Sequence, residues 1–245
     1  MKFRIGIENN NDGRTIAWAL EHPGCFSYGA DAAEGLANFP SAARLYSNWL
    51  TSNGGDWLKL VDDPLPENEE TFDVTFVDQD FEFAEPGRGS MVESFFRYDW
   101  KPLTATDIER LLKLLAWSRR DLLSLVRGLS PEQLTRQHPG ERWDINGILR
   151  HIGSAEWWYQ ERIGFPFPTR EEDLPVEPLG VLEMVRAHLL DLLPKLQGLH
   201  RVIGLEGELW SPRKAMRRTV WHERDHTEHI RKLITPGNRE SWIPA

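Results

Sequence analysis

The chain has 245 residues, of which 40% are hydrophobic, so it can bury the core of one large domain or two small ones. Its single cysteine, Cys25, excludes an internal disulfide and a cysteine-based zinc site. The net charge of −9 is uneven: residues 1–100 carry 7 basic and 18 acidic residues, whereas residues 101–245 carry 22 and 20. The acidic first part argues against nucleic-acid binding there, because phosphate contacts need clustered positive charge.

The N-terminal residues alternate charged and apolar side chains and lack the apolar core of a signal peptide. No apolar run approaches the ~20 residues that a membrane-spanning helix needs. A lone cysteine fits a reducing compartment. We therefore expect a cytoplasmic protein with neither a membrane nor a nucleic acid as partner.

The first hundred residues are predicted to form strands around one helix. The turn signal Asn10-Asn11-Asp12-Gly13 lies between the first two strands. Asp31 is the expected N-cap of a helix that runs to about Leu50 and ends at residues 53–55. Alternation of period two predicts strands at residues 2–8, 14–20, 26–28, 72–76 and 81–83. This order implies a small α+β domain over residues 1–100.

Residues 101–245 read as a separate helical domain behind a linker at residues 100–103. A short helix is expected after the Ser130 cap, and Pro194 indicates a kink or an early end in the third long helix. Apolar residues at helical spacing predict four long helices, at residues 104–127, 144–163, 179–197 and 211–234. Four amphipathic helices joined by polar loops imply a four-helix bundle. The predicted fold class is thus α+β, with a small α+β domain followed by an all-α bundle.

Histidines occupy positions of these helices where a bundle core would hold leucine. His222 and His226 are four residues apart, so their rings project from one helix face. His151 lies on the matching face of the second long helix, between Ile148 and Ala155. The inward face of the last helix is formed by Ala215, Thr219, His222, His226, His229 and Leu233. Burying unpaired imidazoles is costly and a shared metal ion removes that cost, so we predict a divalent-metal site with ligands His151, His222 and His226.

Several readings of this pattern stay open. His222-Glu223-Arg224-Asp225-His226 also matches the HExxH motif of zinc proteases. A core histidine can be hydrogen-bonded rather than ligated, and the pair on the last helix can lie on a solvated face. Three imidazoles would leave positions on the ion for water or substrate, as in a catalytic site. Zinc or nickel is the first expectation for the metal, with iron and manganese as alternatives.

Two segments carry a family resemblance: HPGERWDINGILRHIGSAEWWYQERIG at 138–164 and RTVWHERDHTEHIRKLI at 218–234. They resemble the DinB-like superfamily, four-helix bundles that include bacillithiol transferases and mycothiol-dependent maleylpyruvate isomerase. The resemblance covers residues 101–235 and includes Trp143, His151, His222 and His226. It implies a metal-dependent transfer or hydrolysis on a small molecule, with a low-molecular-weight thiol as a further cofactor. His229 stands where the family commonly has glutamine, and we interpret it as a candidate catalytic acid or base.

The N-terminal segments MKFRIGIE, DGRTIAWALEHPGC and YGADAAEGLANFPSAARLY resemble the HicB-like antitoxin module over residues 1–50. No basic DNA-binding segment is attached to them, so we expect a scaffolding, dimerising or small-ligand role. An unrelated partial α+β domain is the alternative. The function expected of the whole chain is that of an enzyme with a small-molecule substrate, working as a homodimer. The alternative is a non-catalytic protein of binding or stress response.

Overall fold

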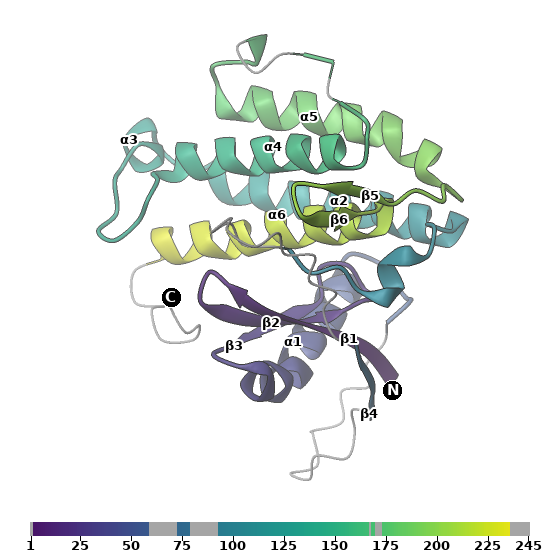
Figure 1. Cartoon of the computed structure of the whole chain (residues 1–245). Coiled ribbons are helices and arrows are strands. Elements are labelled where there is room, and N and C mark those ends of the chain that lie inside the picture. The colour runs from purple at the N-terminus through teal and green to yellow at the C-terminus, as the bar shows by residue number, and fades with distance from the viewer. Residues whose placement is uncertain (1, 59–72, 79–92, 167, 170–172, 236–245) are drawn as a thin grey trace. The chain divides into compact units, whose positions relative to one another are not determined.

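The computed structural model describes residues 2–58, 73–78, 93–166, 168–169 and 173–235 (Figure 1). The chain divides into two compact units. Residues up to Tyr98, together with Glu206–Leu209, belong to the first unit. Asp99–Leu205 and the described residues from Trp210 to Thr235 belong to the second.

The first unit contains a four-stranded sheet of order β3-β2-β1-β4. Its strands are β1 (Lys2–Asn11), β2 (Arg14–Ala19), β3 (Phe26–Gly29) and β4 (Asp73–Asp78). β1 and β2 pair antiparallel, as do β2 and β3, whereas β1 and β4 run parallel. Asp12 and Gly13 form the turn between β1 and β2 with φ of 50° and 76°, the left-handed conformation that a two-residue hairpin turn requires.

Helix α1 (Ala32–Ser52) belongs to this unit and begins at Asp31, whose side chain accepts a hydrogen bond from the Glu34 amide. The helix continues through Pro40. Its apolar face is buried with the apolar face of the sheet; for example, the rings of Phe39 and Phe3 lie 5.2 Å apart edge to face. The core formed in this way contains Phe3, Ile5, Ala17, Phe39, Ala43, Tyr46 and Leu50. Ile16 and Trp18 pair with Glu8 and Gly6 and are buried on the opposite face of the sheet.

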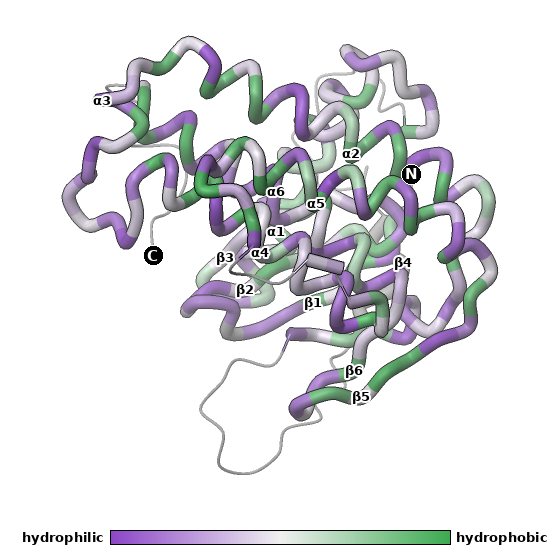
Figure 2. The backbone as a smooth tube through the Cα atoms, turned by 90° about the horizontal axis from the view of Figure 1, so that it is seen from above, coloured by the Kyte–Doolittle hydropathy of each residue, from purple (hydrophilic) through white to green (hydrophobic). Residues whose placement is uncertain are grey.

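The second unit is a bundle of four long helices with a short helix, α3 (Pro131–Leu134), between the first two. The long helices are α2 (Ala105–Val126), α4 (Ile145–Arg162), α5 (Pro178–Leu192) and α6 (Pro212–Ile234). α4 packs against α5 and α6, and α6 also packs against α2 (Figure 1). Hydrophobic and hydrophilic stretches alternate along the helices, as expected for helices with one buried face (Figure 2).

One layer of the bundle core is assembled from all four long helices. It contains Leu122, Val126, Ile145, Ile148, Leu149, Ile152, Leu182 and Ile230. Gly153 allows α4 and α5 to approach closely, since a Cβ at this position would lie 2.8 Å from Cγ1 of Val181. The close contact fixes the spacing of α4, the helix that carries His151.

The α+β class and the four long helices are confirmed. The prediction of a strand ending at residue 8 was too short, because β1 continues to Asn11, which pairs with Arg14. The third long helix ends at Leu192 rather than near residue 197, and a 3-10 turn, η3 (Leu193–Leu196), holds Pro194, so the early end that Pro194 indicated is confirmed. Proline lacks the amide hydrogen that an α-helix needs, which explains the change.

Two short features were not predicted. A 3-10 turn, η1 (Arg97–Trp100), lies at the start of the predicted linker, and a hairpin of β5 (Ile203–Leu205) and β6 (Glu208–Trp210) precedes α6. The predicted strand at 81–83 lies outside the described residues. The HicB-like character of residues 1–50 stays a prediction. Among the described residues, no helix combines the length and the apolar character that crossing a membrane would take.

Candidate metal centre

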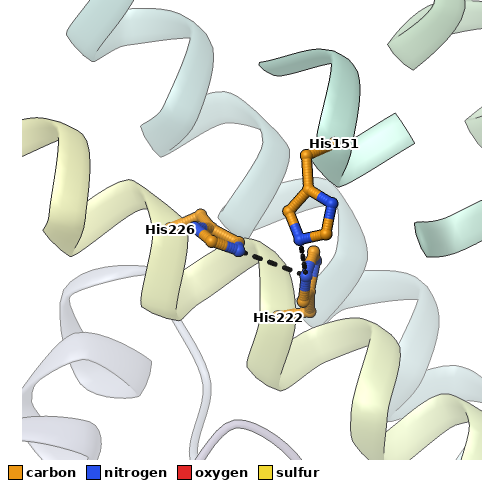
Figure 3. A group of neighbouring side chains, drawn as sticks. All are labelled: His151, His222 and His226. Atoms are coloured by element: carbon orange, nitrogen blue, oxygen red, sulfur yellow. Dashed lines mark hydrogen bonds between the residues drawn. The ribbon is translucent and has the colours of Figure 1, made fainter. Parts of the chain in front are cut away.

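Three histidine side chains from two helices of the bundle converge on one point (Figure 3). His151 comes from α4, and His222 and His226 lie one turn apart on α6. Nε2 of His222 lies 3.0 Å from Nε2 of His151 and 3.2 Å from Nε2 of His226. The three ligand atoms all fall within 4.8 Å of one another. The structure therefore brings together the three histidines that the sequence singled out.

The spacing of these nitrogen atoms fits a shared ion better than a hydrogen-bond chain. An imidazole nitrogen offers either one N–H or one lone pair in the plane of its ring. Nε2 of His222 faces two nitrogens at hydrogen-bond distance, so one in-plane bond cannot serve both contacts. A tetrahedral ion bound at about 2.0–2.1 Å would separate its nitrogen ligands by about 3.3 Å, close to the spacing found.

Burial keeps two of the imidazoles in the neutral form that binds metal. His222 is buried, and this burial, reinforced by His226 and His151, lowers the pKa of His222 well below its usual value of 6.5. Burial, followed by the positive charge of Arg142, lowers the pKa of His151. His151 and His226 remain partly exposed, so the cluster can be reached from solvent on their side.

Trp143 fixes the orientation of one candidate ligand. Its ring stacks on that of His151, with centroids 4.7 Å apart and planes inclined by 28°. Trp143 stands immediately before Asp144, the residue whose side chain caps α4 through the Gly147 amide. The helix cap and the stacked ring therefore hold His151 in place together.

His229 lies outside the convergent group. Its Nε2 is 2.8 Å from Oε2 of Glu141, and its ring centroid is 6.1 Å from that of His226. Glu141 belongs to the loop between α3 and α4, and no pattern in the sequence pointed to it, because loops have no periodicity to follow. The contact orients the ring of His229 next to the three histidines without adding a fourth nitrogen to them.

The bundle of helices and its histidine cluster agree with the comparison to known families. The model of the DinB superfamily matches residues 114–230. This segment is a DinB superfamily domain. The match contains all three convergent histidines of the DinB domain. It also covers all of α4 and α5 and the greater part of α2 and α6.

Two solved structures are similar to the chain. TT2238, described as a four-helix bundle protein, is 23% identical, with a TM-score of 0.41 over 51% of this chain and 98% of its own. YfiT from Bacillus subtilis, described as a probable metal-dependent hydrolase with an unusual four-helix bundle topology, is 17% identical. Its TM-score is 0.43 over 61% of this chain and 91% of its own. No protein of curated function matches the chain.

Glu223 of the DinB domain takes no part in the histidine cluster. Its carboxylate accepts hydrogen bonds from Ser118, Arg119 and Arg186 in the bundle core. Burial alone would raise the pKa of Glu223, but the charges of Arg186 and Arg119 outweigh it and lower the pKa. A zinc protease with an HExxH motif needs this glutamate free to take a proton from water. The contacts of Glu223 therefore argue against the protease alternative.

The basic residues at the start of α6 are committed to other contacts of the DinB domain. Arg213 pairs with Asp107 at 2.7 Å and donates to the carbonyls of Lys101 and Pro102. Arg217 pairs with Asp99 at 2.7 Å. These paired and buried arginines anchor α6 to the chain that leads into α2.

Proposed function

We propose that the DinB domain is a divalent-metal-dependent enzyme that transfers or hydrolyses a group on a small molecule, with a low-molecular-weight thiol or water as the nucleophile. The observation that carries this proposal is the convergence of the three histidines: Nε2 of His222 lies 3.0 Å from that of His151 and 3.2 Å from that of His226, and His151 and His226 are partly exposed. Three histidine ligands are the protein's share of a catalytic site, whereas structural sites usually supply four. A position on the ion would remain for the reacting molecule.

The residues of the site would divide the work between them. His151, His222 and His226 would hold the ion, with zinc or nickel as the first candidates. The bound ion would supply a lowered pKa for a coordinated thiol or water at neutral pH. The carboxylate of Glu141 can accept the Nε2 hydrogen of His229, which leaves Nδ1 of that ring to take up a proton. His229 would thus act as the general base next to the ion.

The experiment that tests this proposal combines metal loading with an activity panel. The full chain is loaded with zinc, nickel, manganese or iron and assayed with low-molecular-weight thiols against alkyl, aryl and epoxide acceptors, and with ester and amide substrates in water. Turnover that depends on the metal and is lost in His226→Ala is expected. A metal-loaded protein that turns over none of these substrates would contradict the enzymatic proposal and favour a non-catalytic binding role.

We further propose that the chain forms a homodimer through its N-terminal unit, as a HicB-like module would. An acidic α+β unit without an attached basic segment supports protein association rather than nucleic-acid binding. Light scattering coupled to gel filtration should give twice the mass of 28.4 kDa. A mass equal to that of one chain across the concentration range would contradict the proposal.

A further inference from the structure

Four charged side chains, one from each long helix, close an ionic ring in the bundle core; three are buried and Arg119 is partly buried. The ionic ring consists of Arg119 on α2, Glu156 on α4, Arg186 on α5 and Glu223 on α6. Arg186 holds both oxygens of Glu156 at 2.8 Å and one oxygen of Glu223 at 2.8 Å. Arg119 completes the ring, donating to Glu223 and, at 3.1 Å, to Glu156.

The two arginines also tie their helices to each other. Nη1 of Arg186 donates to the carbonyl of Leu115 on α2 at 2.6 Å, and Nη1 of Arg119 donates to the carbonyl of Leu182 on α5 at 2.6 Å. Each acceptor lies four residues before the arginine of its own helix. A helix carbonyl has a second lone pair available for such a bond. Each of the two arginines is thereby hydrogen-bonded to all three of the other long helices.

Such a ring is poorly explained as a source of stability. Buried ion pairs can often be replaced by apolar residues of similar volume without loss, because desolvation offsets the attraction between the charges. Hydrogen bonds of fixed direction can instead set geometry, because they resist a slide or a rotation that an apolar seam tolerates. The register of the four helices is the property that the ionic ring is suited to set.

That register determines whether the histidines meet. Glu223 directly follows His222 on α6, so fixing the direction of one side chain fixes the other, about 100° further round the helix. Glu156 lies five residues after His151 on α4, about 7.5 Å along the axis. Arg119 and Arg186 each bridge the two glutamates. The arginines of α2 and α5 thus connect the two helices that carry the histidines.

We propose that Arg119 and Arg186 are positioning residues for the metal centre, which align α4 and α6 through the ionic ring so that His151 meets His222 and His226. This inference rests on the proposed function, because it assigns the ring a role toward the bound ion. The inference goes beyond the proposed function, because it names residues that do not touch the ion. If the ionic ring only stabilised the fold, folded variants that lack it would bind metal as tightly as the wild type.

The test measures cobalt binding to full-length variants by titration and by the visible absorption of the bound ion. The first variant replaces the whole ring with apolar residues of similar size: Arg119→Met, Glu156→Leu, Arg186→Met and Glu223→Leu. The second, Arg119→Lys, keeps the net charge, but its single ammonium cannot reach both glutamates and the Leu182 carbonyl together. The matched control is Arg120→Gln, the neighbouring arginine, which is exposed and paired with Asp121.

We expect cobalt affinity to fall about 10- to 100-fold in the apolar variant, as for other residues that orient metal ligands, with an altered absorption spectrum. Arg119→Lys should show a smaller loss, and Arg120→Gln none. Wild-type affinity and spectrum in both ring variants would overturn the proposal. If the apolar variant does not fold, wild-type cobalt affinity and spectrum in Arg119→Lys alone would overturn it. Wild-type protein that binds no metal would instead refute the proposed function. In that case the positioning role of the ionic ring would be tested by the imidazole ¹⁵N chemical shifts of the three histidines, which Arg119→Lys should change.

Discussion

Replacement of His222 by alanine should weaken metal binding more than any other single change. Its Nε2 lies between those of the other two histidines, at 3.0 and 3.2 Å. Structural zinc sites with four ligands bind with about 10–16 kcal/mol, so one ligand corresponds to about 3 kcal/mol. Since each 1.4 kcal/mol is a factor of about ten, we expect zinc affinity to fall about 100-fold.

A chelator-competition titration measures this change, with circular dichroism to show that the variant is folded. His229→Gln is the matched control. It removes an imidazole that lies on the same helix face but outside the convergent group. Its zinc affinity should equal that of the wild type. A folded His222→Ala variant that binds zinc as tightly as the wild type would refute the assignment of the ligands.

Three further predictions follow from the bundle. Burial, reinforced by His226 and His151, lowers the pKa of His222 below 6.5, so the unfolded chain binds more protons below that pH. Metal-free protein should therefore lose stability as the pH falls from 6.5 through the folded pKa, less steeply in His222→Ala; identical urea midpoints at all pH values would contradict this. Trp143→Leu removes the ring stacked on His151 and should weaken zinc binding about twofold to tenfold, as measured by competition titration. An unchanged affinity would show that the stacking does not orient the ligand. Gly153→Ala should lower the free energy of unfolding in urea by about 1 kcal/mol, because its Cβ would lie 2.8 Å from Val181, and a more stable variant would mean that the helices separate freely.

Periodicity was sufficient to predict the long helices and the inward direction of their histidines. The spacing of His222 and His226 requires only that α6 be helical, and Ser211 and Pro212 at its start give a strong signal for that. The meeting with His151 was predictable because both faces pointed to the core of the same bundle. The metal itself stays a prediction, since the identity of side chains shows what could bind and not what does.

The contacts between distant charged residues could not be predicted from the sequence. Arg119 and Glu223 are 104 residues apart in the chain, and nothing local indicates that they pair. One signal was present: Arg186 follows Leu182 by one helical turn on an apolar face, where a charge is unexpected unless it is paired. Its partners depend on which helices face each other, and the sequence alone does not specify that arrangement.

We expect His151, His222 and His226 to bind one divalent ion together. Diffraction from crystals of the zinc-loaded protein, recorded above and below the zinc absorption edge, locates the ion directly. We expect one anomalous peak per chain, within about 2.0–2.2 Å of the three Nε2 atoms. No peak among these nitrogens, or an ion held by other residues, would contradict it.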